Sequence, residues 1–300
     1  MVKIFVIGAT GVMGRSVVRA LHGAGHSVVG LAQNEAKAEL LAGIDVQPVR
    51  GDLFDVSLLA EAFEGCDVVC NMATHVPVGL AGMRPGAWKA SDRIRSEGAR
   101  IVSSAARLAS VSRLIQESVS VLYADAGDQW IDEASPVAVN RATEPVVLAE
   151  TSAEDFRAPG FESVVLRFGA IIGDDGLTRW RLDRARHGQP VGLGAPSAWT
   201  HLVHADDIGS GVLAALSAPS GTYNVGAEPV QRATLTCGFA QAVGRTDVGF
   251  MSRLVQRLGG ERLEPLTRSQ RVSSSRLTQV AAWKPEQPEF SAEWLTELVS

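Results

Sequence analysis

The strongest constraint on the fold is a glycine-rich turn near the start of the chain. An apolar, strand-like run from Val2 to Ile7 ends at Gly8. Glycines recur at Gly11 and Gly14, and a helical pattern follows at once. In such a turn the first glycine permits the reversal, the second admits a pyrophosphate, and the third lets helix and strand pack closely. Because helix N-termini also attract phosphate, the pattern predicts a dinucleotide site.

Strand and helix patterns alternate through the first half of the chain. Buried strands are predicted at 2–7, 27–31, 45–49, 67–70, 112–118 and 163–168, and helices at 12–24, 56–63, 91–108 and 142–156. An alternating series of this kind predicts one parallel sheet with helices on both faces. The expected fold class is therefore α/β, a Rossmann-type doubly wound parallel sheet.

The composition changes after Gly173. We expect residues 1–172 to form the dinucleotide-binding domain and residues 173–300 a smaller, mostly helical substrate-binding lobe. Some segments of this lobe, such as 199–216, are expected to pack back on the first domain. A predicted helix at 177–187 carries four arginines, Arg179, Arg181, Arg184 and Arg186. They could bind an anionic substrate, although a solvated helix face is the usual role of such charges.

Composition and charge exclude several classes of function. Hydrophobic content is 46% and charged content 20%, which is typical of a globular protein. The net charge of −5 without a basic cluster argues against nucleic acid or an anionic membrane as partner. Since the first strand begins at Val2 and no apolar run is long enough to span a membrane, we expect a cytoplasmic protein. A small-molecule substrate is the expected partner, and a homodimer stays open.

The cysteines agree with that compartment. Cys66, Cys70 and Cys237 are an odd number and lack metal-ligand spacing. They suit a reducing compartment, and we predict no metal site.

The type of dinucleotide is usually determined at the end of the second strand. An acidic residue there binds the ribose 2′-hydroxyl of NAD, but residues 31–34 read Leu-Ala-Gln-Asn. Gln33 could bond a hydroxyl or a phosphate, and Lys37, one turn later, could reach a 2′-phosphate. We therefore favour NADP(H) over NAD(H). The alternative is that Lys37 is an ordinary solvated charge.

Polar residues follow two further strands. Asp52 could accept a hydrogen bond from an adenine amino group, with Leu53 against the ring, or it could be a turn residue. The carboxyl ends of parallel strands face the ligand crevice, so Thr74 and His75 are expected beside the ribose and nicotinamide. Of the six histidines, His75 is the best candidate for a general acid or base. A hydrogen-bonded loop histidine is the alternative.

These residues resemble the extended short-chain dehydrogenase/reductase family, of the NAD(P)-dependent sugar epimerase/dehydratase type. The matching segments run nearly end to end: Gly8–Gly14, Gly51–Leu53, Met72–Thr74, the serine region ending in Tyr123, Leu166–Gly169, Leu202–Asp207, Tyr223–Gly226 and Trp283–Pro285. Together with the assignments above, the resemblance implies that the cofactor contacts Gly8, Thr10, Gly11, Val12, Met13, Gln33, Lys37, Asp52, Leu53, Met72, Ala73, Thr74 and Phe168.

The chain departs from this family in its catalytic residues. The family uses a serine or threonine at the end of the fifth strand, and a tyrosine followed four residues later by a lysine. The tyrosine transfers the proton, and the lysine lowers its pKa. This chain has two tyrosines, Tyr123 and Tyr223, and the residues four positions later are Gly127 and Ala227. The sequence therefore contains no tyrosine–lysine pair of the required spacing.

The residues that replace this pair depend on the alignment. Counting back from Glu150, which resembles the family's helix glutamate, gives Ala142 and Val146. A shift of two residues gives Asn140 and Glu144, which are still one helical turn apart. Both alternatives stay open.

The serine position is displaced as well. Counting back from Tyr123, which resembles a non-catalytic family tyrosine, gives Val119, with Ser118 and Ser120 on either side. Neighbouring residues on a strand face opposite ways, so neither serine replaces the family residue without a local twist.

Two interpretations follow. In the first, an atypical oxidoreductase acts on a small carbonyl or hydroxyl compound, sugar-derived or similar to a secondary metabolite, with catalytic help from His75, Ser118, Tyr123 or Asn140. In the second, the fold serves a non-redox lyase, cyclase or isomerase, or a nucleotide-sensing protein. The intact phosphate and adenine segments favour the first. Trp130, in a polar loop expected to overhang the crevice, could stack on a substrate ring or simply pack.

Overall fold

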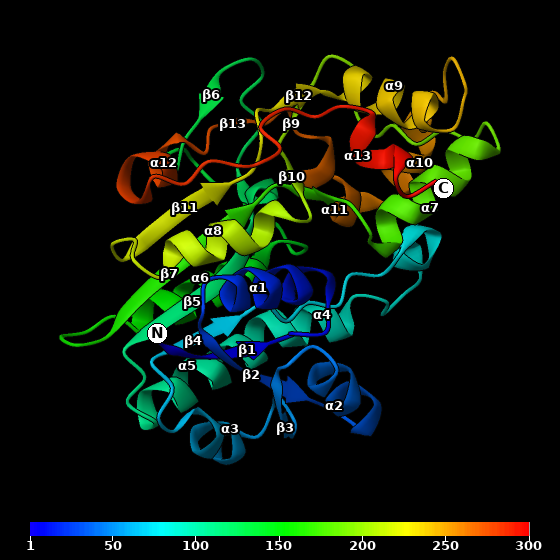
Figure 1. The fold of residues 1–300 in the computed structure, drawn as a ribbon. Helices are drawn as coiled ribbons and strands as arrows, with labels where there is room; N and C mark the ends of the chain where they lie inside the picture. Colours follow the sequence, from blue (N-terminus) through cyan, green and yellow to red (C-terminus); the bar gives the residue numbers. More distant parts are fainter. Residues whose placement is uncertain (300) are drawn as a thin grey trace.

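The computed structural model describes residues 1–299, and its centre is a seven-stranded parallel sheet (Figure 1). From edge to edge the strands are β11 (Gly221–Val225), β7 (Glu162–Phe168), β5 (Arg113–Val119), β4 (Val68–Asn71), β1 (Lys3–Ile7), β2 (Ser27–Ala32) and β3 (Gln47–Arg50). The chain builds outward from β1 to β3, then returns to β4 and builds the other way. The strand order therefore reverses between β1 and β4, where such sheets bind ligands.

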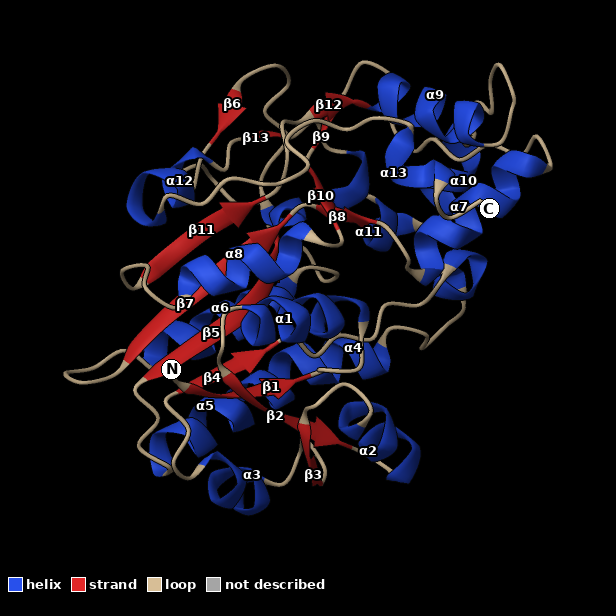
Figure 2. Ribbon diagram, in the orientation of Figure 1, coloured by secondary structure: helices blue, strands red, loops and turns tan. Residues whose placement is uncertain are grey.

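Helices cover both faces of the sheet (Figure 2). Along β1, Ile4 and Val6 pack into one hydrophobic cluster, whereas Phe5 and Ile7 pack into another. The first cluster lies under α1 (Val12–Gly23), α2 (Glu35–Ala42), α8 (Asp207–Ala215) and α12 (Ser275–Ala281), and the second under α3 (Val56–Phe63), α5 (Ala99–Leu108) and α6 (Glu144–Asp155). The predicted doubly wound α/β fold is confirmed.

The helix predicted at 91–108 is interrupted. It consists of α4 (Lys89–Arg93), a π-helical turn at Ile94–Gly98 and α5. The wider turn contains Arg95, whose guanidinium makes a two-pronged ion pair with the buried Glu117 of β5, at 3.1 and 3.2 Å. The periodicity of apolar residues does not reveal a π-helical turn, because such a turn inserts only one residue into the helical pattern.

Residues after 172 form a third hydrophobic cluster. Leu182 of α7 (Gly176–Arg186), Phe239 of α9 (Arg232–Ala242) and Trp294 of α13 (Glu293–Thr296) are buried together in it. This region also contains the helices α10 (Arg253–Leu258) and α11 (Gly260–Leu263). Short 3₁₀ turns lie at Gly79–Met83, Ser120–Leu122 and Pro265–Thr267. Three two-stranded sheets complete the fold: β8 (Ala170–Ile172) with β10 (Leu202–His204), β9 (Trp199–Thr200) with β12 (Val230–Gln231), and β6 (Trp130–Ile131) with β13 (Arg271–Val272).

Part of the C-terminal half also belongs to the central sheet. Strand β11 pairs with β7, and α8 packs on α1. At that contact the Ser16 hydroxyl donates to the carbonyl of Asp206 and accepts from the Gly209 amide, both at 3.0 Å. Because elements after residue 172 lie in both regions, the division into 1–172 and 173–300 stays a prediction. Within residues 1–299, no helix combines the length and apolar character needed to cross a membrane.

Candidate functional site

The glycine turn has the geometry that its sequence predicts. Gly8 has a φ of +80°, and a Cβ there would lie 2.7 Å from the carbonyl oxygen of Met72. A Cβ on Gly14 would lie 2.1 Å from the carbonyl oxygen of Gly8. Both contacts are too short for any side chain, so β1, β4 and α1 meet closely only because glycine occupies these positions.

The first turn of α1 is left open to a ligand. Its N-cap, Gly11, offers no side-chain hydrogen bond, whereas Asn34 caps α2 and Asp55 caps α3. The amides around Val12 and Met13 therefore keep their hydrogen-bonding capacity, which suits the phosphates of a dinucleotide. The residues at this turn fit the predicted cofactor. The proposed contact with Thr10, which is partly buried beside the turn, stays a prediction.

Cationic groups gather at the end of β2. Gln33 is exposed just after the strand, and Lys37 lies in the first turn of α2. Arg50, at the end of β3, pairs in register with Ala32 and forms an ion pair with Glu35 at 2.5 Å. The strand predicted from the sequence ends at residue 49, so the prediction did not include Arg50. Only the strand register brings it beside Gln33.

The predicted adenine residues lie on the next loop. One carboxylate oxygen of Asp52 accepts a hydrogen bond from the amide of Phe54 at 3.1 Å, which closes a turn. Leu53 is buried. This arrangement supports the turn role of Asp52, and the adenine contact stays a prediction.

The end of β4 lies against the glycine turn. Met72 is buried, Ala73 and Thr74 are partly buried, and His75 is exposed. Because the backbone of Met72 adjoins Gly8, this segment borders the predicted cofactor crevice. His75 is therefore on the correct side of the sheet for its predicted role, which stays a prediction.

Ser118 and Tyr123 belong to a buried polar network. The Ser118 hydroxyl donates to Glu150 at 2.5 Å, and Glu150 accepts two hydrogen bonds from Arg167 at 2.8 and 2.7 Å. The hydroxyl of Tyr123 donates to Asn224 at 2.8 Å, and burial raises its pKa. Both side chains are fully buried. These contacts support a structural role, and the catalytic role of either residue stays a prediction.

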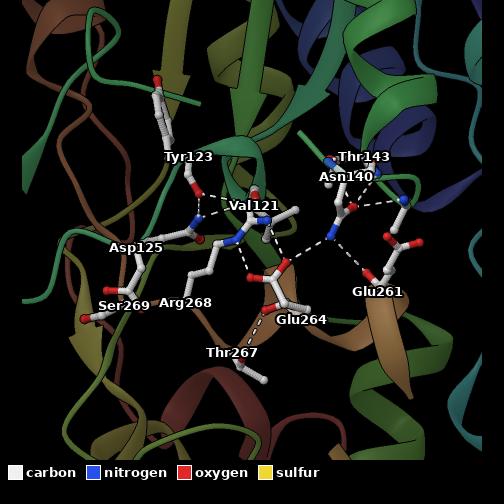
Figure 3. Close-up of polar contacts among 12 residues, drawn as sticks. Val121, Tyr123, Asp125, Asn140, Thr143, Glu261, Glu264, Thr267, Arg268 and Ser269 are labelled. Carbon is white, nitrogen blue, oxygen red and sulfur yellow. Dashed lines mark hydrogen bonds and ion pairs between the residues drawn. The ribbon is translucent and has the colours of Figure 1, made fainter. Parts of the chain in front are cut away.

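Asn140 is tied to the C-terminal half of the chain (Figure 3). Its amide nitrogen donates to the Glu264 carboxylate at 2.9 Å and to the carbonyl of Glu261 at 3.2 Å. Glu264 in turn accepts hydrogen bonds from Arg268. Asn140 thus contacts α11 and the residue that follows it, and its predicted catalytic role stays a prediction. Phe168 is buried in β7, and its predicted cofactor contact also stays a prediction.

Neither alignment restores a tyrosine–lysine pair. Glu150 is buried against Arg167, and Val146, one turn earlier on α6, is buried on the same side. Ala142 precedes the first turn of α6, and the shifted alternative offers Asn140 and the exposed Glu144.

A cavity of about 70 Å³ adjoins the carboxyl end of β5. Its walls include Ser120, just after β5, Arg181 of α7, His201 before β10 and Arg232 of α9. The sequence pattern marks Arg181 only as one of four helix arginines, and it gives no signal for His201 or Arg232. No local signal joins residues so far apart in the chain.

Known proteins resemble this chain in sequence and in fold. A family profile described as NAD(P)H-binding matches residues 8–219. The chain is 28% identical to a 3-diazoavenalumate denitrifying reductase of a Streptomyces species, across 96% of this chain and 97% of that protein. A 4-hydroxy-2-methyl-3-oxo-4-farnesyl-3,4-dihydroquinoline-1-oxide ketoreductase of Stigmatella aurantiaca is 30% identical over 181 residues, 58% of this chain and 51% of that protein.

Solved structures show the same fold at lower identity. The human epimerase family protein SDR39U1 with NADPH superposes with a TM-score of 0.81 at 22% identity, covering 98% of this chain and 99% of that one. MoeE5 in complex with UDP-glucose and NAD gives 0.78 at 20% identity, covering 99% and 100%. The predicted resemblance is confirmed: the chain belongs to the NAD(P)H-binding family and has the fold of the epimerase/dehydratase type of short-chain dehydrogenase/reductase.

Proposed function

We propose that this protein is an NAD(P)H-dependent reductase of a small organic molecule that works without a tyrosine–lysine pair. The observation that carries the proposal is the contrast between two parts of the site. The phosphate-binding turn excludes side chains at Gly8 and Gly14, as cofactor binding requires. One alignment of the catalytic positions gives Ala142 and Val146, which cannot transfer a proton, and the other gives Asn140 and Glu144, which are not a tyrosine–lysine pair either. Similarity to a reductase over nearly the whole chain supports hydride transfer.

The presence of the cofactor turn without the tyrosine–lysine pair limits the classes of substrate that the site can reduce. The bound nicotinamide supplies a hydride, and the turn at Gly8–Gly14 orients the cofactor that carries it. Reduction of a ketone also needs a proton for the oxygen that becomes an alkoxide. An electrophile that is already positively charged needs no such proton. A site without the usual donor therefore favours a charged electrophile, or a carbonyl compound protonated by another group such as His75.

A diazonium group is an electrophile of this kind. Hydride adds to its terminal nitrogen, the carbon–nitrogen bond breaks, and N₂ leaves while the carbon gains the hydrogen. One hydride is consumed for each N₂ released, and no alkoxide forms. The Streptomyces relative, named for the denitrifying reduction of a diazo compound, supports this choice over a plain ketone.

The test is NADPH oxidation with benzenediazonium and with a panel of ketones and aldehydes. We expect protein-dependent oxidation with one N₂ released per NADPH in the diazonium reaction, above the rate measured with heat-unfolded protein. His75→Gln should slow any ketone reduction about a hundredfold and leave the diazonium reaction unchanged. Bound cofactor that no compound in the panel oxidises would contradict the proposal and favour the non-redox alternative.

We also propose that NADP(H) is preferred over NAD(H). Gln33, Lys37 and Arg50 offer donors and positive charge at the end of β2, where a carboxylate would select NAD. The ion pair of Arg50 with Glu35 leaves Lys37 as the more available cation. The ratio of NADPH to NADH affinity in a Lys37→Ala variant measures this contribution.

A further inference from the structure

The cavity at the end of β5 is unusual in its charge. Among the described residues that line it, two are arginines and none is an aspartate or a glutamate. Arg181 comes from α7 and Arg232 from α9, so two helices of the C-terminal half direct positive charge to one small space. Ser120, which also lines the cavity, follows β5 directly and so connects the cavity with the carboxyl edge of the sheet.

Neither guanidinium group forms an ion pair with a carboxylate of residues 1–299. Arg232 is 7% exposed and donates to the carbonyl oxygens of Thr267 and Arg268, at 2.8 and 2.5 Å. Arg181 is partly buried and makes no hydrogen bond or ion pair with any other residue of the range 1–299. Buried charges are usually paired, because an unpaired one carries a large desolvation cost.

The arginines also repel each other. Burial lowers the pKa of Arg232 to about 10; Asp125 opposes this change and the charge of Arg181 adds to it. Burial lowers the pKa of Arg181 too, against the attraction of Asp175. With a pKa of about 10, Arg232 still carries charge at neutral pH. An anion between them would offset the repulsion and the desolvation together.

A third polar group lies in the same wall. His201 is 3% exposed, and its Nδ1 has no hydrogen-bond partner within the described part of the chain. Burial lowers its pKa to about 3, so the imidazole is neutral at physiological pH. It can therefore exchange a hydrogen bond with a ligand without adding a third positive charge.

We propose that this cavity binds the carboxylate of an anionic organic substrate between Arg181 and Arg232. A volume of about 70 Å³ admits a carboxylate but not a nucleoside diphosphate. The planar fork of an arginine matches the two oxygens of a carboxylate. The proposal rests on the reductase function, because the bound carboxylate would point the rest of the same molecule toward the cofactor crevice.

Equilibrium binding tests this proposal without any catalytic step. Benzoate and the neutral benzamide, which is of similar shape, are titrated calorimetrically into the wild-type protein and its variants. We expect benzoate to bind much more tightly than benzamide, and Arg181→Met to weaken benzoate on the order of tenfold or more. Arg181→Lys should recover part of the loss. The matched control is Arg179→Met on the same helix, because Arg179 is exposed and pairs with Asp174 outside the cavity.

Equal affinity for benzoate and benzamide, or an Arg181→Met variant that binds benzoate as the wild type does, would overturn the proposal. Inorganic phosphate that binds more tightly than benzoate and displaces it would assign the cavity to a phosphate group instead. NADPH is titrated into the same variants, and we expect its affinity to be unchanged. A protein that binds benzoate as expected but no NADPH would contradict the reductase function and leave the carboxylate site standing.

Discussion

At the scale of single residues, the space around a glycine decides whether it can be replaced. A Cβ on Gly14 would meet the Gly8 carbonyl at 2.1 Å, whereas a Cβ on Gly23, at the other end of α1, would meet nothing within 4 Å. We expect Gly14→Ala to lower the free energy of unfolding by about 1–3 kcal/mol and to weaken NADPH binding, because α1 must move away from β1. Gly23→Ala should be neutral or stabilising by about 0.5–1 kcal/mol.

Thermal unfolding and NADPH titration of both variants check this prediction. Equal effects of the two substitutions would show that the close contact at Gly14 does not position the phosphate-binding turn.

His201 predicts a pH dependence of stability. Burial lowers its pKa from 6.5 to about 3, so between these values the unfolded chain binds a proton that the folded chain does not. The contribution of neutral His201 to the free energy of unfolding is therefore fully present above pH 6.5 and is lost as the pH falls toward 3. Between pH 7 and pH 5 this residue should reduce the free energy of unfolding by about 2 kcal/mol.

Denaturant unfolding at the two pH values measures the effect. His201→Gln should lose less stability on acidification than the wild type, and His187→Gln, which changes an exposed histidine, should behave as the wild type does. A wild type and a His201→Gln variant with the same pH dependence would rule this explanation out.

The sequence predicted the spatial arrangement of residues that are close together in the chain. The turn at Gly8–Gly14 is local, so its strand, glycines and helix are visible in one stretch. The network of Ser118, Glu150 and Arg167 is not local, and its closure shows only when β5, α6 and β7 lie side by side. The cavity between Arg181 and Arg232 depends in the same way on tertiary packing.

At the scale of elements, periodicity predicted the order of strands and helices but not every break or position. The π-helical turn at Ile94–Gly98 leaves the apolar pattern almost unchanged. The place of β11 at the edge of the central sheet depends on its pairing with β7. Pairing between distant segments is set by the packing of the whole fold rather than by local preference.

The contact between α1 and α8 gives a prediction at this scale. The Ser16 hydroxyl both donates to Asp206 and accepts from Gly209, so Ser16→Ala removes two hydrogen bonds and leaves the buried Gly209 amide without this partner. We expect a loss of about 1–3 kcal/mol in the free energy of unfolding. Ser217→Ala, which changes an exposed serine beyond the end of α8, should stay within about 0.5 kcal/mol of the wild type.

Denaturant unfolding of the two serine variants provides the measurement. A Ser16→Ala variant as stable as the Ser217→Ala control would mean that apolar packing alone holds α8 on the sheet.

At the scale of the whole molecule, the phosphate-binding turn and the arginine-lined cavity lie along one edge. The turn follows β1 and the cavity adjoins the end of β5, with β4 between these strands. Parallel strands end on the same side of a sheet, so the cofactor and the substrate carboxylate would approach each other across that edge. Under the proposed reductase function, this arrangement would direct a hydride by positioning in a chain without a tyrosine–lysine pair.

Calorimetric titration of the purified protein with NADPH and with NADH measures whether the glycine turn binds a dinucleotide. We expect saturable binding of NADPH, weaker binding of NADH, and a thermal midpoint that rises with NADPH concentration. Lys37→Ala should reduce the NADPH preference about tenfold, and Lys89→Ala, on a different helix, should not. The absence of both a heat of binding and a rise in the thermal midpoint, with NADPH and with NADH, would contradict cofactor binding by this protein.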